Sequence, residues 1–209
     1  MTGSPARKVA RLLFHLASQP QYVLPYIKTN LLARTSALEL ELPWISYAAI
    51  DFLDDFARPE MSVCEYGSGG STLFFAKRCT SLISIEDNAI WLDKVRQRLL
   101  DAKVDNVRLE HRPFDFKSAS GFETSEYLNA IPDQKFDIIL VDGSEEGVQV
   151  RPTCFAYAER FVRPGGIIVV DDSWRYVELR RQNRATQCKV FQSVGPCRPG
   201  VTSTDIFFY

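Results

Sequence analysis

Carboxylate side chains stand at or near the ends of several apolar segments of this 209-residue sequence, beside glycines or other turn residues. They are Glu65, Glu86, Asp87, Asp142, Asp171 and Asp172. If these segments are parallel strands, their carboxyl ends meet at one edge of a sheet and the acids gather there. Such a cluster suits a ligand with a positive centre, such as a sulfonium or ammonium group, or a hard divalent cation.

The stretch from Val63 to Lys77 has the pattern of a strand, a tight turn and a helix. Gly67 and Gly69 allow φ > 0 and let a ligand approach without a Cβ in the way. Ser71 stands where the helix should begin, and its hydroxyl can cap free N–H groups. A helix N-terminus behind a glycine turn suits an anion, such as a phosphate or the carboxylate of an amino acid.

Two residues of this stretch weigh against a pyrophosphate ligand. Thr72 stands where the dinucleotide motif G-x-G-x-x-G has its third glycine. Glu65 would place negative charge near a pyrophosphate, whereas it suits a sulfonium or an α-ammonium group.

The acids of the second apolar segment have two interpretations. Glu86 lies at its carboxyl end and can accept hydrogen bonds from the paired hydroxyls of a ribose. Asp87 or Asn88 can instead cap a helix over 89–101. Both roles are compatible, with Glu86 on a ribose and the next residues on the helix.

Hydrophobic patterns predict an α/β fold with a doubly wound, mostly parallel sheet of seven strands between two layers of helices. Strands are expected at 62–66, 81–86, 107–111, 136–141, 167–170, 188–194 and 202–209. Helices are expected at 43–56, 70–78, 89–101, 151–161 and 174–183, with a short one near 123–130. No helix separates the last two strands, so they should form a hairpin that makes the last strand antiparallel.

The chain divides into a helical N-terminal extension, residues 1–41, and one domain over residues 42–209. Two helical stretches, 7–18 and 21–35, are expected in the extension. The extension is a candidate surface for homo-oligomer formation.

Composition limits the class of protein. The net charge of −1 offers no large cationic field for nucleic acid. No apolar run reaches the roughly 18–20 residues that span a bilayer. The five cysteines form no C-x-x-C pair, so a zinc site is not expected and reduced thiols of a cytoplasmic protein are.

The ordered motifs E-x-G-x-G-G-S-T, Ile-Glu, Phe-Asp-x-Ile-x-Val-Asp-Gly and Pro-Gly-Gly-x-x-x-x-Asp-Asp resemble class I S-adenosylmethionine-dependent methyltransferases from about residue 42 onward. By that resemblance, Gly67, Ser68, Gly69 and Ser71 hold the methionine part of the cofactor. Glu86 takes the ribose, and Asp142 lies near the sulfonium and is the candidate catalytic residue. Glu65 and Asp87 complete the candidate cofactor-binding set.

A narrower resemblance concerns the metal-dependent O-methyltransferases, in which acids after the fourth and fifth strands bind magnesium. Asp142, Asp171 and Asp172 stand at matching places. A divalent cation there would lower the pKa of a substrate hydroxyl. The alternative is that Asp171 and Asp172 only cap the next helix and Asp142 only binds cofactor.

The function expected is therefore methyl transfer to a small-molecule acceptor, most simply at a hydroxyl. One alternative is a protein of the same fold that binds cofactor without turnover. A further alternative is an NAD-dependent oxidoreductase, which Glu65, Thr72 and the terminal hairpin oppose.

Overall fold

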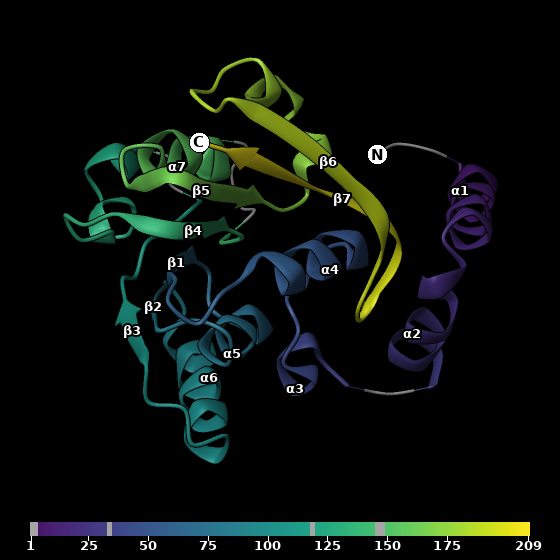
Figure 1. The fold of residues 1–209 in the computed structure, drawn as a ribbon, viewed down its shortest axis with the longest axis horizontal. Helices are drawn as coiled ribbons and strands as arrows, with labels where there is room; N and C mark the ends of the chain where they lie inside the picture. The colour runs from purple at the N-terminus through teal and green to yellow at the C-terminus, as the bar shows by residue number, and fades with distance from the viewer. Residues whose placement is uncertain (1–3, 33–34, 118–119, 145–148) are drawn as a thin grey trace.

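The computed structural model describes residues 4–32, 35–117, 120–144 and 149–209. Its centre is a seven-stranded sheet in the order β3-β2-β1-β4-β5-β7-β6 (Figure 1). The strands are β1 (Ser62–Tyr66), β2 (Ser81–Glu86), β3 (Val107–His111), β4 (Phe136–Val141), β5 (Val162–Val170), β6 (Gln187–Gly195) and β7 (Arg198–Phe208). β1 to β5 pair in parallel, and β7 runs antiparallel to β5 and β6. The predicted doubly wound sheet with its antiparallel last strand is confirmed.

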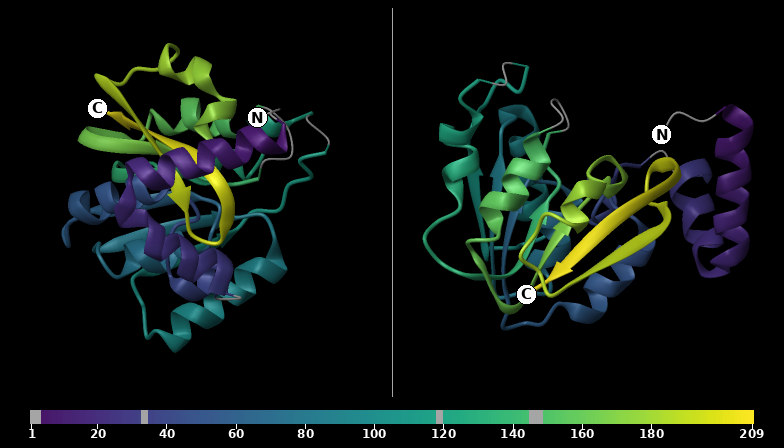
Figure 2. Two further views of the ribbon diagram at one scale, coloured as in Figure 1. Left: turned by 90° about the vertical axis from the view of Figure 1, so that its right-hand side faces the viewer. Right: turned by 90° about the horizontal axis from the view of Figure 1, so that it is seen from above.

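Helices cover both faces of the sheet (Figures 1 and 2). They are α1 (Pro5–Ser18), α2 (Val23–Ile27), α3 (Ala37–Leu40), α4 (Tyr47–Phe56), α5 (Gly70–Ala76), α6 (Ala89–Asp101) and α7 (Val150–Ala158). Shorter helical turns are η1 (Pro20–Tyr22), η2 (Lys28–Leu32), η3 (Phe122–Thr124), η4 (Leu128–Ala130), η5 (Ser173–Arg175) and η6 (Val177–Arg180). Along β4, Ile138 and Leu140 join the core shared with α4, whereas Ile139 and Val141 join the core shared with α7. This alternation produces the three layers.

The N-terminal segment packs on the hairpin of β6 and β7, as the two further views show (Figure 2). It also contacts α4, where Tyr22 OH donates to Asp51 Oδ2 (2.7 Å). Tyr22 and Tyr26 belong to the same core cluster as α4 and one face of the sheet. Gln19 Nε2 donates to Gln192 O (3.0 Å), and Asn30 Nδ2 donates to Gly195 O (3.2 Å). The hydrophobic core therefore continues across the expected boundary at residue 42.

Three helical expectations are corrected. The helix expected from Pro43 begins only at Tyr47, because Ser46 is its N-cap and the chain before it is irregular, with a bend at Trp44 and Ile45. The helix expected over 174–183 is two turns, η5 and η6, which break where Tyr176 turns its side chain into the core. The helix expected near 123–130 is likewise two separate turns, η3 and η4.

None of the helices in the described part of the chain combines the length and the apolar character needed to cross a membrane.

Candidate functional site

The glycine turn after β1 is held against the end of β4. Gly67 has φ +88°, and a Cβ there would lie 2.6 Å from Asp142 O, so only glycine fits. Gly70 is also required by packing, because its Cβ would lie 2.1 Å from Leu42 O. Gly69 differs: its φ of 169° suits any residue, and a Cβ there would meet no atom within 4 Å. The described protein atoms therefore give no reason for glycine at position 69, whereas a ligand close to the backbone would.

Glu65 lies beneath this turn and supports it. Its Oε1 accepts hydrogen bonds from the hydroxyls of Thr72 and Ser84, and Thr72 Oγ1 accepts a bond from Gly69 N (2.9 Å). Glu65 is fully buried and is not among the residues that line the adjacent cavity. The contact with a cationic ligand that the sequence suggested is thus replaced by a positioning role.

Burial raises the pKa of Glu65 to about 7, from 4.5 for an exposed glutamate. Between these values the folded protein retains a proton that the unfolded chain has released. The free energy of unfolding should therefore fall as pH rises through this window, by on the order of 3 kcal/mol.

Glu65→Gln removes the titration and keeps an acceptor for both hydroxyls. In urea unfolding at pH 5 and pH 8, we expect the variant to lose less stability than the wild type. Parallel losses in both proteins would contradict this account of Glu65.

Glu86 joins the end of β2 to the glycine turn. Its Oε2 accepts hydrogen bonds from Ser68 N and Ser68 Oγ (both 2.9 Å), and its Oε1 accepts one from Asn88 N (3.0 Å). A carboxylate has about four acceptor positions, so capacity remains for a ligand hydroxyl. Asn88 Oδ1 accepts from Trp91 N (3.0 Å) and is the N-cap of α6. Of the two capping candidates, Asn88 rather than Asp87 holds the helix.

A cavity of about 1090 Å³ lies along the carboxyl ends of β1, β2, β4 and β5. All candidate site residues except Glu65 line it: Gly67, Ser68, Gly69, Ser71, Glu86, Asp87, Asp142, Asp171 and Asp172. Residues of α1 and of the turn between β6 and β7 complete its lining. The sheet therefore brings together residues that are more than 100 positions apart in the sequence.

Asp142 is paired with an arginine that the sequence analysis missed. Arg151 stands at the start of α7, and its Nη2 lies 3.1 Å from Asp142 Oδ1. The same guanidinium donates to Gly143 O and to Asp171 O, with distances of 2.9 to 3.1 Å. Arg151 is only 5% exposed and thus ties the ends of β4 and β5 together. Burial raises the pKa of Asp142, with Arg151 opposing that shift.

Asp171 and Asp172 face a second arginine that the sequence analysis missed. Arg198 Nη1 lies 3.0 Å from Asp171 Oδ2, and Arg198 Nη2 lies 3.1 Å from both carboxylate oxygens of Asp172. Thr204 Oγ1 donates to Asp171 Oδ1 (2.8 Å), and Thr202 Oγ1 donates to Asp172 Oδ1 (2.9 Å).

These contacts bear on the predicted magnesium site. Within the described ranges, no group of three His, Cys, Asp or Glu side chains is arranged to hold a metal ion. The carboxylates of Asp171 and Asp172 are directed at Arg198, and that of Asp142 at Arg151. The residues present do not fit a magnesium ion bound by these three acids, and that prediction is corrected.

All three tryptophans of the sequence line the cavity: Trp44, Trp91 and Trp174. Trp91 Nε1 donates to Ser68 O (2.7 Å), and Trp174 Nε1 donates to Asp172 Oδ1 (3.2 Å). Trp44 is half exposed and stacks on the Arg198 guanidinium, with 5.1 Å between Cζ and the ring centroid. The cavity therefore combines acids, four arginines and flat aromatic surfaces, and its tryptophans provide a fluorescence signal for ligand binding.

Comparison with known proteins agrees with the resemblance to methyltransferases. A family model described as a methyltransferase domain matches residues 64–173. No curated protein sequence matches the chain.

Several solved structures share the fold. A putative O-methyltransferase from Klebsiella pneumoniae aligns with a TM-score of 0.60 and 17% identity, covering 99% of each chain. The O-methyltransferase TomG from Streptomyces achromogenes, involved in tomaymycin synthesis and solved with S-adenosylmethionine, aligns with a TM-score of 0.59 and 19% identity, also covering 99% of each. An rRNA methylase from Streptococcus thermophilus aligns with a TM-score of 0.56 and 13% identity over 76% of this chain and 92% of that one.

Proposed function

The chain belongs to this methyltransferase domain family and is an S-adenosylmethionine-dependent methyltransferase, and from that premise we propose that it methylates a hydroxyl group of a small molecule. The observation that carries the proposal is the single cavity that holds the candidate cofactor residues and extends to α1 and the β6–β7 turn. Its volume of about 1090 Å³ is slightly larger than the roughly 300–1,000 Å³ of ordinary ligand pockets, so it has room for a cofactor and an acceptor together.

The residues present fit the cofactor. The open space over Gly69 admits a ligand against the backbone, and Glu86 retains acceptor capacity for a ribose hydroxyl. S-adenosylmethionine, when bound, supplies a methyl group on a positively charged sulfur. We propose that Gly67, Ser68, Gly69 and Ser71 contact its amino-acid part, that Glu86 and Asp87 contact its nucleoside part, and that Asp142 lies near the sulfonium.

A proton acceptor is needed to methylate a hydroxyl. Asp142 lines the cavity, and its burial raises its pKa, which makes the carboxylate a better base than an exposed aspartate. We therefore assign Asp142 the catalytic role of removing the acceptor proton. Arg151 holds the carboxylate in place through the contact between its Nη2 and Asp142 Oδ1.

The test is an acceptor panel with methyl transfer followed by mass spectrometry. It should contain phenols, sugars and polyketide-like alcohols, together with matched amines and short RNAs. The proposal expects methylated alcohols or phenols only. Methylation of RNA or amines would overturn it, and cofactor binding without any transfer would favour the non-catalytic alternative. The family match and the antiparallel β7 oppose the NAD-dependent alternative.

The net charge of −1 supports the proposal that nucleic acid is not the acceptor.

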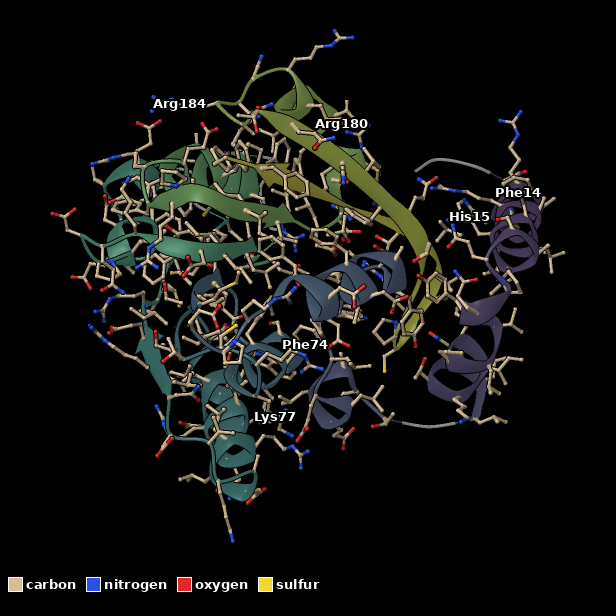
Figure 3. All side chains as sticks on the ribbon, viewed as in Figure 1. Phe14, His15, Phe74, Lys77, Arg180 and Arg184 are labelled. Carbon is tan, nitrogen blue, oxygen red and sulfur yellow. The ribbon has the colours of Figure 1, made fainter. Side chains whose placement is uncertain are left out.

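The proposal of a homo-oligomer rests on apolar side chains of α1 that are exposed to solvent: Val9, Leu13 and Phe14. Figure 3 labels Phe14 on α1 at the edge of the molecule. Sedimentation velocity would test whether these residues pair two copies.

Substitution of Glu86 tests the proposed ribose contact. Glu86→Ala should weaken binding of S-adenosylhomocysteine by about 1–3 kcal/mol, because a hydrogen bond to a charged acceptor is lost. Glu86→Gln should weaken it less, since an oxygen acceptor remains. Asp93→Asn, an exposed carboxylate of α6, is the matched control and should bind normally. Quenching of tryptophan fluorescence measures all four proteins, and unchanged affinity in Glu86→Ala would remove this residue from the site.

A further inference from the structure

The acids after β5 are held by three residues of the terminal hairpin, of which one carries a charge. Arg198 starts β7, and a register shift separates it from Thr202 and Thr204. These two threonines stand two positions apart, so their side chains share one face of the strand. That face meets Asp171 and Asp172. The guanidinium bridges both carboxylates, and each threonine hydroxyl donates to one of them.

All four oxygens of the two carboxylates thereby have donors. Asp171 Oδ1 accepts from Thr204, and Asp171 Oδ2 accepts from Arg198. Both oxygens of Asp172 accept from Arg198 Nη2, and Asp172 Oδ1 also accepts from Thr202. A divalent ion would have to displace these donors and then lie beside a guanidinium of the same charge sign, which costs free energy at short range.

Further contacts fix the guanidinium in place. Arg198 Nη1 also lies 3.3 Å from Trp44 O and 3.2 Å from Thr202 Oγ1, and the Trp44 ring covers the group. Only 16% of the Arg198 side chain is exposed. A planar guanidinium that binds two carboxylates and an aromatic face is geometrically specific, and lysine would not reproduce these contacts.

We infer that Arg198 is the resident cation of this cluster, in the place where the metal-dependent enzymes hold magnesium, so that methyl transfer by this protein needs no divalent ion. The assignment of Arg198 as the resident cation rests on its contacts alone. The independence of methyl transfer from a divalent ion also rests on the proposed function. A corollary is that removing the guanidinium frees Asp171 and Asp172 for oxygen coordination of a cation.

The experiment is titration with Mn²⁺ in a calorimeter, without cofactor, on the wild type, Arg198→Ala and Arg198→Ala combined with Asp172→Asn. The wild type should show no stoichiometric binding. Arg198→Ala should bind one Mn²⁺ per chain, about tenfold or more tighter than the wild type, and the double variant should lose that site. If Arg198→Ala does not fold, Arg198→Gln takes its place because it also removes the charge.

A second readout is thermal unfolding in MgCl₂ against NaCl of equal ionic strength. Mg²⁺ should raise the melting temperature of Arg198→Ala and leave that of the wild type unchanged. Stoichiometric Mn²⁺ binding by the wild type that Asp172→Asn abolishes would overturn the inference. A folded Arg198 variant that gains no Mn²⁺ site would overturn it as well. Because neither measurement uses the cofactor, failure here is distinct from failure of the proposed function, which absence of S-adenosylhomocysteine binding would reveal.

Discussion

Gly69→Ala should fold as well as the wild type and bind S-adenosylhomocysteine about 5- to 150-fold more weakly. The backbone at position 69 is extended, and an added Cβ would meet no atom of the described residues within 4 Å, so stability should not change. The methyl group would instead occupy space that the ligand needs, which corresponds to an overpacking cost of about 1–3 kcal/mol. Thermal unfolding and a fluorescence titration measure the two effects separately.

Gly67→Ala provides the contrast within the same turn. Its Cβ would lie 2.6 Å from Asp142 O at a φ of +88°, so this variant should lose stability whether or not a ligand is present. Wild-type affinity in Gly69→Ala would show that no ligand approaches this glycine. The placement of the cofactor beside the turn would then be wrong.

Arg151→Met should lower the free energy of unfolding by about 3–5 kcal/mol. The guanidinium is 5% exposed and bonds to two carbonyl oxygens and to Asp142, so its removal takes away the donor that pairs a largely buried carboxylate and two carbonyl oxygens. Arg151→Lys keeps the charge but cannot reach all three partners, and it should lose less. Urea unfolding at neutral pH gives both values.

Arg163→Met is the matched control for this measurement. Arg163 pairs with Asp137 at 3.0 Å, but its side chain is 48% exposed, so the change should cost about 1 kcal/mol or less. A loss of that small size in Arg151→Met would contradict the role of Arg151 as the tie between β4 and β5.

The sequence predicts the framework of this fold because the framework follows from hydrophobic patterns. The buried run before Asp142 is β4, and the segment that ends in Glu86 is β2, with the predicted bounds. Elements whose limits depend on tertiary contacts are predicted less well. The segment around Pro43 is irregular rather than helical because Trp44 reaches to the hairpin. There its Nε1 donates to Cys197 O (3.3 Å), and nothing local encodes that contact.

The acids of the site are predictable because each follows a strand, and parallel strands bring their carboxyl ends together. Their partners are harder to predict, since Arg151 lies on a helix and Arg198 is the first residue of β7, where the local sequence gives no sign of its target. One signal was present: Arg151 is the one charged residue of the helix Val150–Ala158, where a buried charge needs a partner. Arg198 has no such signal, so the sequence does not reveal that Asp171 and Asp172 face a guanidinium.

A crystal structure of the complex with S-adenosylhomocysteine tests the central claim most directly. The account predicts the ligand in the cavity at the carboxyl ends of β1, β2 and β4, with its ribose hydroxyls on Glu86 and its amino-acid part against Gly69. Electron density for the ligand elsewhere on the protein, or a ribose turned away from Glu86, would contradict it.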